Sequence, residues 1–129
     1  MPKVGDVMST ALLTVDASTP LVEAAKLMNE HSVGAVLVFA GDRVGGILTE
    51  RDVLRAVALG QVERTDVGTW MTHHPETIEP SDSTGHAASI MIHGGFRHLP
   101  VVDAGKPVGI VSIRDLMRVV LDDETPRGA

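Results

Sequence analysis

The chain has 129 residues, of which 43% are apolar, 17 are acidic and 11 are basic, so its formal net charge at pH 7 is −6. A negative chain without clusters of Lys and Arg argues against nucleic-acid binding, and the absence of cysteine excludes disulfides, thiol chemistry and cysteine-based metal sites. No apolar run approaches the ~18 residues of a membrane helix, and the N-terminus lacks the basic and apolar regions of a secretory leader, so we expect a cytoplasmic protein without a membrane or nucleic-acid partner.

The opening segment, residues 1–12, is expected to contain one short helical turn, and a strand over residues 13–15 follows it. A helix then begins, with Ser18 or Thr19 as the predicted N-cap. Pro20 is expected at the first helical position, where its fixed φ is suitable and its missing N–H is not needed. Apolar residues recur at helical spacing after it and predict one buried face.

Two strands and a second helix complete the first half of the chain. Residues 35–39 are apolar, Gly41-Asp42 is a turn signal, and residues 44–48 are expected to return antiparallel. A partly apolar helix follows, and the polar residues 60–66 lead to the second half. The predicted order is therefore strand, helix, strand, strand, helix.

The second half repeats the first at a fixed distance of 63 residues, so that Val4 aligns with Val67 and Met28 with Met91 without any gap. A register kept over more than fifty residues indicates a duplicated unit. We expect repeats at residues 4–60 and 67–122, followed by a polar tail at residues 123–129. Two copies are too few for a solenoid, and halves of this size are marginal alone, so a pseudo-twofold pair is the expected arrangement.

The second repeat carries its own start and stop signals. Its first strand is expected at residues 76–78, and Ser81 or Asp82 is the predicted N-cap of the helix that follows. Gly94-Gly95 should end that helix, because glycine tolerates left-handed geometry. Pro100 lies in the next strand, which should therefore lack a partner or bulge at that point.

One seven-residue motif occurs in both repeats and is the candidate functional element. It reads Gly-Ile-Leu-Thr-Glu-Arg-Asp at residues 46–52 and Gly-Ile-Val-Ser-Ile-Arg-Asp at residues 109–115. The pattern predicts a buried strand that leads directly into a helix. The free N–H groups of a helix N-terminus suit phosphate. The aspartate one turn into the helix has a carboxylate that can accept from both hydroxyls of a ribose, and the glycine would leave room for a ring.

A purely structural interpretation of the motif is also available. In a capping box, Thr49 with Asp52, or Ser112 with Asp115, would satisfy each other's backbone donors. Duplication does not separate the two interpretations, because a cap is copied along with the rest of the unit. Aspartate in a place where a capping box prefers Glu or Gln favours the ligand interpretation.

The duplicated motif, the order of the elements and the segment Arg97-His98-Leu99-Pro100-Val101-Val102-Asp103 make the chain resemble a tandem CBS domain pair, or Bateman module, over residues 4–121. The resemblance implies an α/β (α+β) fold of two β-α-β-β-α repeats packed sheet against sheet. It also implies two clefts that bind adenosine nucleotides or related ligands, and association of pairs into disc-like dimers. Other members regulate an attached enzyme, channel or transporter, whereas here we expect a stand-alone module with a separate, unknown partner.

Each implied cleft takes residues from both repeats. One site combines the second motif with the first repeat, through Ser112, Arg114, Asp115, Leu13, Val33, Gly34 and Ala35. The other site combines the first motif with the second repeat, through Thr49, Arg51, Asp52, His74, Pro75, Phe96, Arg97 and His98. Arg97 and His98 add positive charge to the second group, which is therefore expected to bind phosphate better than the uncharged wall at residues 33–35.

The histidines do not predict a metal site. His86 and His93 are seven residues apart on one helix, so about 10 Å separates their backbones, and zinc needs nitrogen ligands at about 2.1 Å. No Ser-His-Asp or paired-carboxylate pattern is visible in the sequence, so we expect neither an enzyme nor a required cofactor.

These observations lead to a regulatory sensor that binds AMP, ADP, ATP, S-adenosylmethionine or NAD. The alternative is a nucleotide-free scaffold that acts only through protein–protein contacts. The second helix of each repeat carries more apolar residues than one buried face needs, which predicts a homodimer through Leu54, Val57, Leu116, Met117, Val119, Val120 and Leu121.

Overall fold

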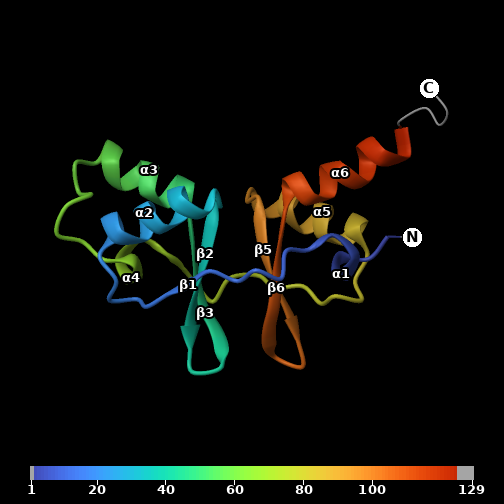
Figure 1. Cartoon of the computed structure of the whole chain (residues 1–129), viewed down its shortest axis with the longest axis horizontal. Coiled ribbons are helices and arrows are strands. Elements are labelled where there is room, and N and C mark those ends of the chain that lie inside the picture. Colours follow the sequence, from blue (N-terminus) through green and yellow to red (C-terminus); the bar gives the residue numbers. More distant parts are fainter. Residues whose placement is uncertain (1, 125–129) are drawn as a thin grey trace. The chain divides into compact units, whose positions relative to one another are not determined.

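The computed structural model describes residues 2–124, which form two compact units (Figure 1). The continuous unit is Leu12–Pro75, and the discontinuous unit joins Met1–Ala11 to Glu76–Ala129. Both combine helices with β-strands, so the mixed α+β class predicted from the sequence is confirmed. In each unit a long β-hairpin projects beyond the helices (Figure 1).

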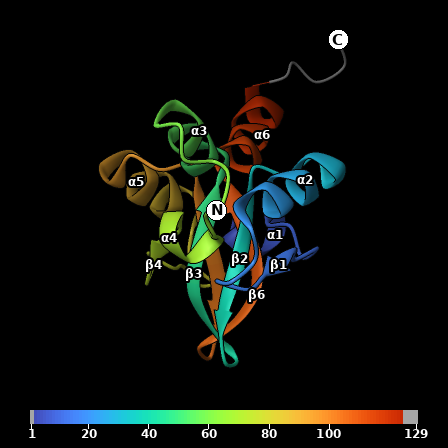
Figure 2. The same ribbon diagram turned by 90° about the vertical axis from the view of Figure 1, so that its left-hand side faces the viewer.

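The continuous unit contains a four-stranded sheet in the order β1-β2-β3-β4, which can be followed in Figure 2. The strands are β1 (Thr14–Val15), β2 (Ala35–Ala40), β3 (Arg43–Thr49) and β4 (Thr72–His73). β1 runs parallel to β2, whereas β3 is antiparallel to both β2 and β4. β4 has no counterpart in the strand order predicted from the sequence.

Three helices accompany this sheet, namely α2 (Leu21–His31), α3 (Glu50–Ala58) and α4 (Val67–Trp70). The core of the unit is aliphatic and is formed by Leu21, Ala24, Met28, Val36, Val38, Leu48, Ala56 and Val67. Trp70 packs against this core, and its indole N–H donates to the Thr65 hydroxyl at 2.9 Å. Branched aliphatic side chains and methionine therefore fill an interior that is almost without aromatic residues.

The discontinuous unit has the same plan with a shorter sheet. Its elements are α1 (Val4–Val7), α5 (Thr84–Gly94), β5 (His98–Asp103), β6 (Lys106–Ser112) and α6 (Ile113–Glu124). β5 and β6 form an antiparallel hairpin. Isolated bridges from Ile78 to Val101 and from Ser9 to Ile110 take the places that β1 and β4 occupy in the continuous unit. The core here is formed by Val4, Ile78, Ala87, Met91, Leu99, Val101, Val111 and Leu116.

The compact units do not coincide with the sequence repeats, because the short leading helices are exchanged. α1 opens the first repeat along the chain, yet Val4 is fully buried in the core of the discontinuous unit, and its N–H donates to Asp82 O at 2.8 Å. α4 leads the second repeat, yet Val67 is fully buried in the continuous unit and donates to Thr19 O at 2.9 Å. Each unit therefore contains most of one repeat and the short opening helix of the other repeat.

The predicted strand at residues 76–78 is reduced to the single bridge at Ile78, and Pro100 explains why. In the continuous unit, Leu37 N–H donates to Leu13 O at 3.0 Å. Pro100 takes the place of Leu37 after a shift of 63 residues and has no N–H to donate. Ile78 still donates to Pro100 O at 3.1 Å and accepts from Val102 N at 2.8 Å, so two of the bonds remain.

The helix starts differ from the sequence expectation by one or two residues. Pro20 is the N-cap of α2 and not its first helical residue. Ser83 caps α5 and accepts from His86 N at 3.1 Å, whereas the Asp82 carboxylate accepts from Glu79 N before the helix begins. At α2 no side chain accepts a capping hydrogen bond. Before α5 three residues of capping type stand in a row, Ser81, Asp82 and Ser83, so local sequence alone could not select the one that caps.

The far end of the chain is helical for longer than expected. α6 continues to Glu124, two residues into the predicted polar tail, and residues 125–129 of that tail lie outside the described residues. None of the helices in the described part of the chain combines the length and the apolar character that a bilayer span requires.

Candidate functional site

The first motif forms the corner at which β3 passes into α3. Thr49 is the N-cap of α3, and Asp52 occupies the third helical position. The Asp52 carboxylate oxygen Oδ2 accepts from Thr49 N at 2.9 Å and from the Thr49 hydroxyl at 3.1 Å. The side chain of Asp52 is only 8% exposed. The capping-box interpretation of the motif is thus confirmed for Oδ2, one of the two oxygens of the Asp52 carboxylate.

The second motif forms the equivalent corner between β6 and α6. Asp115 Oδ2 accepts from Ser112 N at 2.8 Å and from the Ser112 hydroxyl at 3.0 Å, while Asp115 N donates back to that hydroxyl at 3.2 Å. The Asp115 side chain is 13% exposed. Both aspartates therefore use Oδ2 to hold the helix N-terminus, and each keeps Oδ1 for another partner.

The surroundings of Oδ1 differ between the two corners. Arg118 Nη1 donates to Asp115 Oδ1 at 3.1 Å. Its counterpart Arg55 holds Nη1 at 3.8 Å from Asp52 Oδ1, which is an ion pair without a hydrogen bond. In the described part of the chain, Asp52 Oδ1 accepts no hydrogen bond from a protein donor.

Each corner lies beside the start of the first hairpin strand of its own unit. Ala35 pairs with Thr49, and Glu50 N donates to Gly34 O at 3.0 Å. In the other unit His98 pairs with Ser112, and Ile113 N donates to Arg97 O at 2.9 Å. Thus the uncharged segment adjoins the Asp52 corner and the basic pair adjoins the Asp115 corner. Each predicted site combines residues of both units, and that grouping stays a prediction.

The motif glycines have a packing role that differs from the expected one. A Cβ atom on Gly46 would lie 2.5 Å from Met71 Sδ, and one on Gly109 would lie 2.7 Å from Met8 Sδ. The two methionines follow α4 and α1 respectively. The space beside each glycine is therefore filled by the segment after a leading helix, so the idea that these glycines leave room for a ligand ring was wrong.

The other predicted residues occupy varied environments. His74 lies in the continuous unit with a left-handed backbone, φ 49°, and its N–H donates to Gly45 O at 3.2 Å. Leu13 packs against the core of the same unit, next to β1, and Pro75 ends that unit. Phe96 packs against the core of the discontinuous unit, and a Cβ atom on Gly94 would collide with the Phe96 ring. The guanidinium-bearing residues Arg51, Arg97 and Arg114 are exposed.

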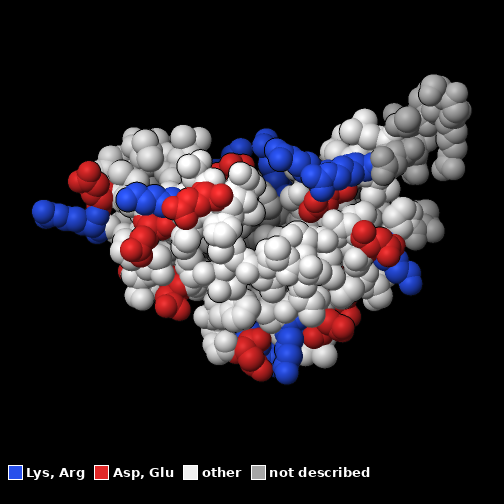
Figure 3. All heavy atoms as spheres, in the orientation of Figure 1, with Lys and Arg blue, Asp and Glu red and all other residues white. Residues whose placement is uncertain are grey.

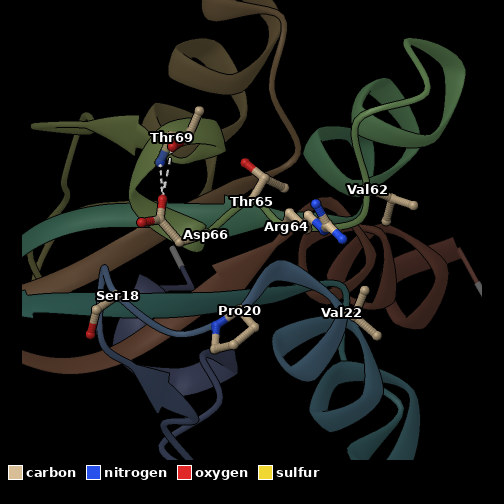
Figure 4. A pocket seen from close by; sticks show the side chains of 8 residues that line it. All are labelled: Ser18, Pro20, Val22, Val62, Arg64, Thr65, Asp66 and Thr69. Carbon is tan, nitrogen blue, oxygen red and sulfur yellow. Dashed lines mark hydrogen bonds between the residues drawn. The ribbon is translucent and has the colours of Figure 1, made fainter.

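A surface hollow of about 370 Å³ lies beside the start of α2, and none of the predicted ligand-binding residues lines it (Figure 4). It is lined by Ser18, Pro20, Val22, Val62, Arg64, Thr65, Asp66 and Thr69. Much of its polar lining has a structural task, since Asp66 caps α4 by accepting from Thr69 N at 3.0 Å and from the Thr69 hydroxyl at 2.8 Å. Sequence reasoning missed this hollow because its walls come from two distant segments, and only the polar linker was a signal.

The charged surface does not form a single-sign field on the face seen in Figure 3, where acidic and basic side chains are intermixed. Among residues 2–124, no three His, Asp or Glu side chains come close enough together to hold a metal ion. Among the described residues Asp52 is the buried charged residue, and the Asp115 side chain is only 13% exposed, so these two corner carboxylates are the candidates for recognising a ligand with hydroxyl groups.

Comparison with known proteins identifies clear relatives. The family model of the CBS domain matches the chain twice, at residues 4–59 and 65–122. The chain is 35% identical over 130 residues to the CBS domain-containing protein YhcV of Bacillus subtilis (strain 168), and the match covers 100% of this chain and 93% of that protein.

Two similar solved structures contain ligands. The CBS domain pair of protein MJ0100, in complex with 5′-methylthioadenosine and S-adenosyl-L-methionine, has a TM-score of 0.89 and 25% identity, with 96% of this chain and 99% of that chain covered. CBSX2 in complex with AMP has a TM-score of 0.81 and 28% identity, with 97% and 100% covered. The similarity extends over nearly the whole chain in both cases.

Proposed function

Because the chain belongs to the CBS domain family, we propose that it is a regulatory module that binds an adenosine-type ligand and signals the presence of that ligand to a partner protein. One observation carries the proposal. Each motif aspartate is nearly buried and uses Oδ2 for its helix cap. Oδ1 of Asp115 also accepts from Arg118, whereas Oδ1 of Asp52 accepts from no donor in the described chain and is available as an acceptor at a helix N-terminus. Two similar CBS structures hold AMP or methylthioadenosine and S-adenosylmethionine, which supports this class of ligand.

The proposed binding follows from simple electrostatics. The carboxylate oxygen accepts from ribose hydroxyls, while the partial positive charge of the helix N-terminus favours a phosphate nearby. We group Thr49, Arg51 and Asp52 with His74, Pro75 and residues 96–98, and we group the second motif with Leu13 and residues 33–35. The first group contains more positive charge, and Asp52 Oδ1 accepts no protein hydrogen bond in the described chain, so we propose it as the tighter site.

No required cofactor or catalytic step belongs to this proposal, and the similar proteins are named for CBS domains and not for a reaction. We expect the module to act in the cytosol. The exposed apolar residues of α3 and α6, among them Leu54, Val57 and Met117, favour a protein contact as well. A homodimer through these helices is part of the proposal, and a scaffold without any ligand is the alternative function.

The proposal is tested by calorimetric titration with AMP, ADP, ATP, S-adenosylmethionine and NAD. Asp52→Asn is the informative variant, because the amide oxygen can still accept from Thr49 N while the amide nitrogen replaces the second acceptor with a donor. A lost charged hydrogen bond is worth about 1.5–3 kcal/mol, so we expect at least a tenfold loss of affinity. Asp115→Asn should weaken binding less.

Three outcomes separate the possibilities. Binding that Asp52→Asn weakens more than Asp115→Asn supports the function and the ranking of the sites. The reverse order keeps the function and inverts the ranking. No binding of any of the five ligands at millimolar concentration supports the scaffold, provided that denaturation and chromatography show no nucleotide already carried by the purified protein.

A further inference from the structure

The two motif corners match closely except at one atom. In both, Oδ2 of the aspartate accepts from the backbone N–H and the hydroxyl of the capping residue. In both, an arginine three residues later forms an ion pair with Oδ1 of the aspartate. Only Arg118 comes within hydrogen-bond distance, at 3.1 Å from Asp115 Oδ1, whereas Arg55 stays at 3.8 Å from Asp52 Oδ1.

The two corners differ in whether Oδ1 of the aspartate already accepts a hydrogen bond, and not in how exposed the aspartate side chain is. The Asp52 and Asp115 side chains are exposed to similar degrees, and so are those of Arg55 and Arg118. Figure 3 shows basic side chains lying over α6 with acidic ones beside them. A ribose hydroxyl that approaches Asp115 must therefore displace a charged donor or share the oxygen with it. A hydroxyl that approaches Asp52 meets an oxygen that is ion-paired with Arg55 at 3.8 Å but accepts no hydrogen bond from residues 2–124.

We propose that Arg118 is a specificity-determining residue that lowers the affinity of the Asp115 corner for ligands with vicinal hydroxyls. This inference rests on the proposed function and goes beyond it, because it assigns the inequality of the two sites to one side chain. Arg118 is largely exposed, so its hydrogen bond competes only modestly. The expected result of its removal is a gain of about two- to fivefold in affinity at this corner.

Adenosine is the suitable probe, because it carries the two hydroxyls without a phosphate. Loss of the arginine charge then has no direct electrostatic effect on the ligand. Titrations are made in the Asp52→Asn background, in which the first corner no longer offers its acceptor. We expect Asp52→Asn/Arg118→Gln to bind adenosine about two- to fivefold more tightly than Asp52→Asn alone.

Arg55→Gln in the same background is the matched control. It removes the equivalent arginine from the other corner and should leave the affinity unchanged. A gain of affinity cannot arise from damaged folding, which would weaken binding. Unchanged or weaker binding after Arg118→Gln overturns the inference, and an equal gain after Arg55→Gln overturns it as well, because the effect would then be one of general charge.

Failure of this inference and failure of the proposed function are distinguishable. If wild-type protein binds adenosine and Arg118→Gln gives no gain, the inference alone is wrong. If neither wild-type protein nor any variant binds adenosine or the five ligands above, the proposed function is contradicted and the inference falls with it.

Discussion

At the scale of single residues, His74 is the strained position among the predicted site residues. Its φ of 49° is unusual for a residue with a side chain, and it stands directly before Pro75, which restricts it further. Ala104, in the β5–β6 hairpin turn, has a similar φ of 51° but belongs to no predicted site. Comparing substitutions at His74 and Ala104 therefore distinguishes an effect of backbone strain from an effect of losing the imidazole.

We expect His74→Gly and Ala104→Gly each to raise the free energy of unfolding by about 1 kcal/mol, because glycine adopts positive φ without a steric penalty. Chemical denaturation measures this change. Only His74→Gly should also weaken AMP binding, since only His74 is proposed to lie near the phosphate. Equal AMP affinity in the two variants would remove His74 from the site.

At the scale of the elements, the short helices α1 and α4 have equivalent sequences and serve different units. Val4 and Val67 are both fully buried, each in the core of the unit that its helix completes. A four-residue helix has almost no stability of its own, so its position is decided by where its apolar side chain finds a core. Because α1 and α4 are exchanged between the units, the same substitution at Val4 and at Val67 should destabilise different units.

Val4→Ala and Val67→Ala should each cost about 2 kcal/mol through loss of buried methyl groups. Hydrogen exchange locates the effect. Val4→Ala should accelerate exchange in β5 and β6, and Val67→Ala should do so in β2 and β3. Faster exchange mainly in β2 and β3 after Val4→Ala would contradict the assignment of α1 to the discontinuous unit.

At the scale of the whole molecule, the first prediction concerns self-association. Leu54 is 67% exposed and Val57 is 54% exposed on α3, which is unusual for apolar residues so close together. We expect light scattering to give about twice the chain mass of 13.6 kDa at micromolar concentration. Leu54→Glu/Val57→Glu should shift the protein toward monomer.

Ile92→Glu is the control for this experiment, because Ile92 is exposed to 75% but lies on α5, outside the predicted interface. It should leave the mass unchanged. A wild-type mass of one chain would contradict the homodimer directly. Loss of the dimer in Ile92→Glu alone would move the interface to α5.

The second whole-molecule prediction concerns thermal stability. A ligand that binds only the folded state stabilises it by about 2.7 kcal/mol at a hundredfold excess over Kd. For a chain of this size the melting temperature should rise by several degrees. We expect such a shift with at least one adenosine nucleotide, measured by calorimetry or dye fluorescence, and we expect its loss in Asp52→Asn/Asp115→Asn. A shift that persists in the double variant would place the nucleotide elsewhere.

Much of the local structure of this protein could be predicted from its sequence alone, because the sequence patterns that indicate it are local or occur in both repeats. Turn residues predicted the hairpin turn at Gly41-Asp42 and the end of α5 at Gly95, where φ is 72°. Pro100 correctly predicted a missing strand contact, since the lost N–H is a covalent property. The capping box in both motifs was also readable, because it joins residues three apart.

Only the tertiary structure decided where distant segments meet. Nothing local to Val4 states that it is buried in the core with Val101, and nothing local to Gly46 states that Met71 fills the space beside it. The same holds for the two arginines. Arg55 and Arg118 have equivalent places in the sequence, and only the structure shows that the Arg118 guanidinium donates to its carboxylate while that of Arg55 stays 3.8 Å away. Sequence determines which groups are present, whereas tertiary packing determines which of their atoms remain available to a ligand.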